Sequence, residues 1–173
     1  MSSASESGGA RAERFVLVRR IIEAWALLGG VLLVVIALMN TWSMASLALL
    51  NIPVPGDFEL VEMGVAIAAF SFLPYCQLTG ANVTADIFTA RASPVWVACF
   101  SLLAALAAAF FSTILIWRMT DGMVSYIEYE EVTTILNIPR WFAFPPILVS
   151  LALLVMAAAI TLMEAVRTML DAV

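Results

Sequence analysis

The sequence contains no histidine and no lysine, so all eight of its basic side chains are arginine. Without histidine, the chain cannot build a histidine proton relay, a histidine-ligated metal site or a histidine-ligated haem. Without lysine, it has neither a Schiff-base nucleophile nor the lysine of a phosphate-binding loop. The two cysteines, Cys76 and Cys99, are too few for a disulfide framework and do not form a CxxC pair, so we interpret them as buried apolar thiols. We therefore expect no metal site and no cofactor.

Charged residues are also scarce. They make up 12% of the 173 residues, whereas hydrophobic residues make up 64% and the mean hydropathy is +1.04. A soluble domain is nearer half apolar and a quarter charged, so the apolar excess must face lipid or protein. We expect an integral membrane protein in contact with the lipid bilayer. A net charge of -5 argues against nucleic acid as a partner.

Four apolar runs are long enough to cross a bilayer, which takes about 20 helical residues. They cover residues 21–42, 60–78, 95–117 and 141–163. The first run is longer than the 7 to 15 residues of a cleavable signal-peptide core, so we interpret it as a retained span. All five tryptophans lie close to the ends of these runs, as indoles at the lipid headgroup layer do. The sequence predicts an all-α membrane protein, with an N-terminal segment (1–20) and a single four-helix membrane domain (21–173).

The arginines predict the orientation of this bundle. Six lie in the N-terminal segment, the second connection and the C-terminal end, and only Arg118 and Arg140 lie on the opposite side. The six are Arg11, Arg14, Arg19, Arg20, Arg91 and Arg167. Because cytoplasmic segments near span ends retain positive charge, we expect both termini in the cytoplasm.

Several residues predict irregularities in and between the spans. Gly29 and Gly30 are expected to loosen the first span, and Pro74 is expected to kink the second. Residues 119–139 form an acidic connection, in which the pattern allows either a short interfacial amphipathic helix or a solvated loop. The tetrapeptide Leu50-Asn51-Ile52-Pro53 recurs as Leu136-Asn137-Ile138-Pro139, and in each copy proline constrains the chain before the following helix.

No ionisable side chain lies near the middle of a predicted span. Glu23 and Glu62 each lie one turn inside a span, from which a carboxylate can reach the interface. A self-sufficient transporter needs a charged group in its path, and an enzyme needs a catalytic constellation, and neither is found. We therefore expect a subunit that packs against something larger and is not an enzyme. The alternative is a small oligomeric exchanger or channel that uses Glu62 or Glu23.

Two sequence features are candidates for contact with such a partner. Ser101, Ala105 and Ala109 form a stripe of small residues that lets another backbone approach the third span. After Gly80, the apolar and polar residues alternate as in a helix lying in the cytoplasmic interface, with Asp86 close to Arg91. Residues 82–84 fit the N-glycosylation pattern, but the predicted topology places them in the cytoplasm, so we do not expect modification there.

At two segments the sequence resembles the small membrane subunit of tripartite ATP-independent periplasmic (TRAP) transporters. In that family a Gly-x-His-x-x-x-Asp-like stretch follows the second span, and Gly80 to Asp86 lie along it. The fourth span of the family often opens with Thr-x-x-Leu-x-Ile-Pro-x-Trp, which is reproduced by Thr133, Leu136, Ile138, Pro139 and Trp141. Asn82 occupies the place of the family histidine, and asparagine cannot titrate near neutral pH.

The resemblance implies a function and a set of partners. A periplasmic substrate-binding protein would deliver an organic acid or related solute to a large membrane subunit, which moves it with sodium across the bacterial inner membrane. The small subunit would join the stationary scaffold of that large subunit. The candidate partner-interface residues are Gly80, Asn82, Asp86, Arg91, Glu62, Ser101, Ala105, Ala109, Pro139 and Trp141.

Overall fold

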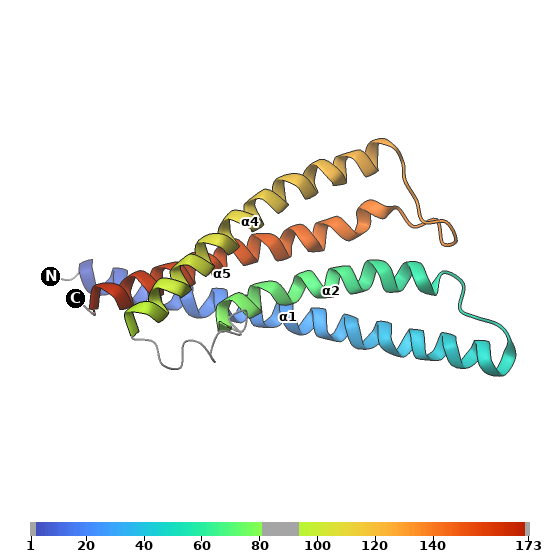
Figure 1. The fold of residues 1–173 in the computed structure, drawn as a ribbon, viewed down its shortest axis with the longest axis horizontal. Coiled ribbons are helices and arrows are strands. Elements are labelled where there is room, and N and C mark those ends of the chain that lie inside the picture. Colours follow the sequence, from blue (N-terminus) through green and yellow to red (C-terminus); the bar gives the residue numbers. More distant parts are fainter. Residues whose placement is uncertain (1–2, 81–93, 172–173) are drawn as a thin grey trace.

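The computed structural model describes residues 3–80 and 94–171, with side chains described for residues 15–80, 100 and 102–166. These residues form four long helices, shown in Figure 1. The helices are α1 (Ser3–Leu50), α2 (Asp57–Thr79), α4 (Pro94–Glu128) and α5 (Phe144–Asp171), and the short 3-10 helix η1 (Arg140–Ala143) precedes α5. Each long helix contains a segment long and apolar enough to cross a membrane. The prediction of an all-α protein with four spans is confirmed.

The helices differ in length from the apolar runs. α2 matches its run closely, whereas α1 is one helix of 48 residues that continues to Leu50. Residues 119–128 continue α4 to Glu128, so the separate interfacial helix and the solvated loop were both wrong for this part of the connection. Gly122 alone does not end the helix, because a single interior glycine costs only about 1 kcal/mol. The interfacial helix predicted after the second span falls in residues 81–93, outside the described residues.

The four helices lie side by side, with α2 and α5 in the centre. α1 packs on α2, α2 on α5 and α5 on α4. Figure 1 shows that α1 begins and α5 ends at the same end of the bundle, here called the termini end. The connections 51–56 and 129–139 lie at the opposite end, here called the loop end. An even number of spans requires this arrangement.

Most of the core is supplied by α5. Ile147, Leu151 and Leu154 form one buried cluster, which packs against side chains of α2 and α4 such as Phe70 and Leu115. A second cluster, nearer the termini end, joins Leu153 and Ala157 of α5 to α1. The outer helices α1 and α4 keep broad apolar faces exposed. In a membrane these faces meet lipid or another subunit.

Small and polar residues join α1 to the two central helices. The Trp25 Nε1–H donates to Ser150 Oγ at 2.9 Å and thereby joins α1 to α5. α1 is continuous through Gly29 and Gly30, and Gly29 lies where Ser71 of α2 approaches. α2 likewise continues through Pro74 to Thr79. Gly29 is therefore a contact point between helices.

Candidate functional site

The loop of residues 129–139 is organised by its own hydrogen bonds. An isolated β-bridge joins Val132 to Pro139. The Thr133 N–H donates to the Ile138 carbonyl at 2.9 Å, and the Ile138 N–H donates back to Thr133 Oγ1 at 3.0 Å. Thr133 is only 4% exposed, so these bonds lie at the centre of the loop. The loop is a narrow, internally paired turn that leads directly into η1.

Glu59 of α2 attaches this loop to the rest of the protein. Its two carboxylate oxygens accept the Ile135 N–H at 2.7 Å and the Leu136 N–H at 3.0 Å. The side chain of Leu136 lies against Gly56, which has a φ of +72°. Bonds from backbone N–H groups to a carboxylate are among the stronger hydrogen bonds in proteins. The loop is therefore held on the first turn of α2 by both polar and apolar contacts.

The repeated Leu-Asn-Ile-Pro sequence has a structural counterpart. Asn51 and Asn137 both adopt a left-handed backbone, with φ of 57° and 53°. Asparagine tolerates this conformation better than most residues, because its short polar side chain hydrogen-bonds locally. The proline two residues later keeps the residue before it out of the helical region. Both copies therefore turn the chain at the loop end.

We expect Glu59→Ala to release the loop without unfolding the helices. The Ile135 and Leu136 N–H groups would lose their shared acceptor, so their amide hydrogens should exchange faster with solvent. Hydrogen exchange measured by mass spectrometry on the full chain in detergent would report this over residues 131–138. Glu62→Ala is the control, because Glu62 makes no bond to the loop. Unchanged exchange in Glu59→Ala would contradict the attachment.

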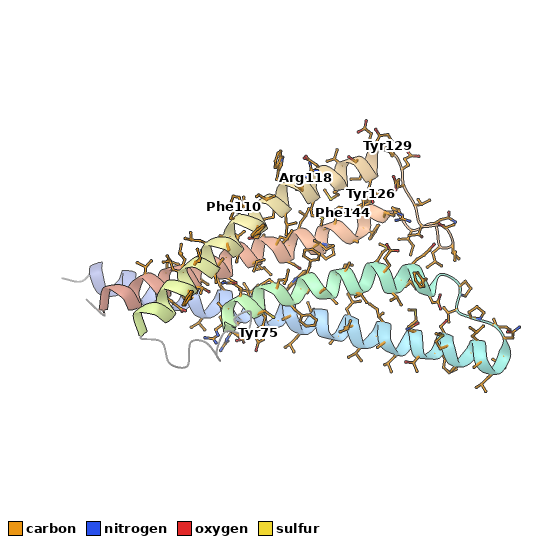
Figure 2. All side chains as sticks on the ribbon, viewed as in Figure 1. Tyr75, Phe110, Arg118, Tyr126, Tyr129 and Phe144 are labelled. Atoms are coloured by element: carbon orange, nitrogen blue, oxygen red, sulfur yellow. The ribbon has the colours of Figure 1, made fainter. Side chains whose placement is uncertain are left out.

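A small polar pocket lies beneath the loop, between α2, α4 and η1. Its volume is about 160 Å³, and Glu59, Glu62, Tyr126, Thr133 and Arg140 line it together with several apolar side chains. The rings of Tyr126 and Phe144 close one side, with their centroids 5.3 Å apart (Figure 2). Among the described residues, the Glu62 carboxylate and the Arg140 guanidinium have no hydrogen bond or ion pair.

The described residues contain no chemistry of an active centre. No group of three or more side chains there could hold a metal ion. No buried polar side-chain atom in the same part of the chain lacks a hydrogen-bond partner. At the loop end, charged side chains lie beside exposed apolar ones such as Phe58 and Ile135.

The family model for tripartite ATP-independent periplasmic transporters, DctQ component, matches residues 41–168. This match covers well over half of the chain and includes the whole of α2 and α4. The chain belongs to this family. It is a transmembrane transport protein, a component of a TRAP transporter, as the resemblance at residues 80–86 and 133–141 predicted. No curated protein and no solved structure matches the sequence.

The predicted interface residues of this DctQ component do not form a single site. Glu62 lines the loop-end pocket, and Pro139 and Trp141 flank Arg140 at the same end. Gly80 ends α2 at the termini end, with a φ of +69°. Asn82, Asp86 and Arg91 lie outside the described residues.

Part of the small-residue stripe of the DctQ component packs within the chain itself. Ala105 is only 1% exposed and Ala109 is half-buried, on a helix whose main neighbour is α5. The side chain of Ser101 is outside the described set. A partner contact through Ser101, Ala105 and Ala109 remains a prediction.

The remaining candidate acid, Glu23, lies at the termini end of the DctQ component. Its carboxylate accepts a hydrogen bond from Arg19 Nε at 3.4 Å, one helical turn away. Both side chains are about half exposed, so this ion pair contributes under about 1 kcal/mol. Sequence reasoning missed Glu59, because an acid in the first turn of a helix is ordinarily explained by the helix dipole alone.

Proposed function

We propose that the chain is a non-catalytic scaffold subunit of a TRAP-type secondary transporter. It would support a large membrane subunit in the sodium-coupled, binding-protein-dependent uptake of an organic acid or related solute. Family membership supports the transporter. The scaffold role is argued from the distribution of charge in the spans.

The observation that carries the scaffold role is the absence of acidic and basic side chains from the middle of the described spans. The last acidic or basic side chain before the middle of the span is Glu23 in α1 and Glu62 in α2, and in α4 the first one after the middle is Arg118. The hydroxyl groups at depth bond their own helix: Ser71, for example, donates to the Ile67 carbonyl at 2.8 Å. Sodium or proton coupling requires a polar path across the membrane. A large subunit would have to supply that path.

The exposed helix faces support the same role. α1 and α4 flank the bundle and keep large side chains exposed, such as Phe110 and Phe111 on α4. We propose that part of this surface packs on the large subunit, and that Asp86 and Arg91 add a contact with it. With both termini in the cytoplasm, the loop end would face the periplasm of a bacterial inner membrane and the substrate-binding protein.

Reconstitution into liposomes tests the proposal. The purified chain alone, supplied with a sodium or proton gradient and a mixture of organic acids, is expected to show no uptake above protein-free liposomes. Adding the large subunit and the binding protein of the same transporter should restore sodium-dependent uptake. Uptake by the chain alone would contradict the scaffold role.

The alternative is a small exchanger, and Glu62 favours it because this acid is exposed and has no partner among the described residues. Glu23 is a weaker candidate, since it is paired with Arg19. If the chain alone did transport, loss of uptake in Glu62→Gln with retention in Glu23→Gln would assign the path to Glu62.

A further inference from the structure

A second hollow lies beside the polar pocket, on the other side of Met63. It is a groove of about 450 Å³ between α1 and α2. Its lining is apolar and comes from three parts of the chain: Leu32, Val35, Ile36 and Met39 of α1, Leu60, Met63, Gly64 and Ile67 of α2, and Ile138 and Phe142 above them. Val35 and Phe142 are more than half exposed, so the groove opens to the surroundings. Because it lies within two spans, those surroundings are lipid or another membrane subunit.

The polar pocket carries one free charge of each sign. Glu59 is occupied by the Ile135 and Leu136 N–H groups, which leaves Glu62 and Arg140. Neither side chain has a partner among the described residues. Both lie near the loop-end limit of their spans, which is the depth of lipid headgroups. Met63 lines both hollows, so the charged pocket and the apolar groove are adjacent.

We propose that the loop end binds one phospholipid with a zwitterionic amine headgroup. The guanidinium of Arg140 holds the phosphate, since arginine matches phosphate oxygens with paired N–H donors. The carboxylate of Glu62 holds the ammonium group. An acyl chain passes Met63 and fills the groove between α1 and α2. The lipid would fill a gap between two helices of the same chain.

The chemistry of the two adjacent hollows favours a lipid as their occupant. The groove is lined by apolar side chains and runs about 10 Å along α2 from Leu60 to Ile67, at 1.5 Å per residue. The pocket beside it is lined by the charged side chains of Glu62 and Arg140. A charged headgroup joined to a flexible hydrocarbon chain matches both hollows at once.

The headgroup contact can be tested on the full chain by native mass spectrometry. The protein, purified in detergent, is titrated with phosphatidylethanolamine and separately with phosphatidylglycerol, which carries the phosphate without the amine. We expect one phosphatidylethanolamine to bind at least about tenfold more tightly than phosphatidylglycerol. Arg140→Gln should weaken binding about tenfold, as expected for loss of a charge-assisted hydrogen bond. Glu62→Gln should remove the preference for the amine.

Two matched controls make the test specific. Arg118→Gln removes an exposed arginine of α4 that lines neither hollow, and should leave binding unchanged (Figure 2). Met39→Trp fills the groove and should abolish retention of the lipid, whereas Leu38→Trp, on the exposed side of α1, should not.

Three results would overturn the proposal. The first is equal binding of the two lipids by the parent, and the second is an equal effect of Arg140→Gln and Arg118→Gln. The third is formation of a crosslink to the large subunit from a cysteine at position 39 in the assembled transporter, which would place a protein in the groove. If Arg140→Gln fails to fold, two other measurements still test the proposal. These are the comparison of the two lipids on the parent protein and the comparison of Met39→Trp with Leu38→Trp.

Discussion

Gly56→Ala is expected to lower the free energy of unfolding by about 2 to 5 kcal/mol, which would be a large effect for one methyl group. Gly56 has a φ of +72°, a left-handed conformation that costs a residue with a Cβ about 1 to 2 kcal/mol. The new Cβ would also lie only 2.6 Å from Leu136 Cδ1. Leu136 would have to move to make room for the added methyl group, and overpacking of this kind typically costs about 1 to 3 kcal/mol. Denaturant unfolding in detergent, followed by tryptophan fluorescence, would measure the loss.

Gly80→Ala separates the two causes. Gly80 has nearly the same φ, +69°, but no heavy atom lies within 4 Å of the position of its Cβ. Gly80→Ala should therefore lower the free energy of unfolding only by the conformational cost of about 1 to 2 kcal/mol. The difference between the two variants measures the contact between Gly56 and Leu136. Equal losses would mean that the loop does not rest on Gly56.

The sequence predicted the spans better than the helix ends, because an apolar run and the helix that contains it end at different residues. The apolar run of the first span ends near Trp42, but α1 continues to Leu50 and stops where Asn51 turns left-handed before Pro53. Those stop signals were visible in the sequence. α4 likewise outlasts its run, and Glu130 has a φ of +49°, which nothing about a glutamate predicts.

The loop end could be predicted only in part. The motif from Thr133 to Trp141 was recognised, but its structural reason is a contact with Glu59, which is 76 residues from Ile135 in the sequence. A single sequence carries no signal for a pair so distant. The bond of Trp25 was missed for the same reason, since its partner Ser150 lies 125 residues away. Local sequence patterns predicted the helices. Which side chains contact one another depends on tertiary contacts between residues that are far apart in the sequence.

Gly29→Val is expected to disrupt the packing of α1 on α2. A Cβ at Gly29 would lie 2.7 Å from Ser71 Cβ and 3.4 Å from the Ala68 carbonyl oxygen. Ser71 and Ala68 are both buried, so α2 cannot easily yield at this point. The two helices would have to separate, and overpacking of this kind typically lowers the free energy of unfolding by about 1 to 3 kcal/mol. Unfolding in detergent should show the loss, and the Trp25–Ser150 contact should weaken with it.

Gly30→Val adds the same side chain one residue further along α1. There the nearest atoms to the new Cβ are those of the Phe72 ring at 3.9 Å, which is ordinary contact. Both substitutions introduce a β-branched residue into the same helix, so their effects on helix propensity are equal and small. Any difference in stability between the two variants therefore comes from the approach of α2 to Gly29. If Gly30→Val were as damaging as Gly29→Val, the glycine pair would act through the flexibility of α1, as expected from the sequence alone.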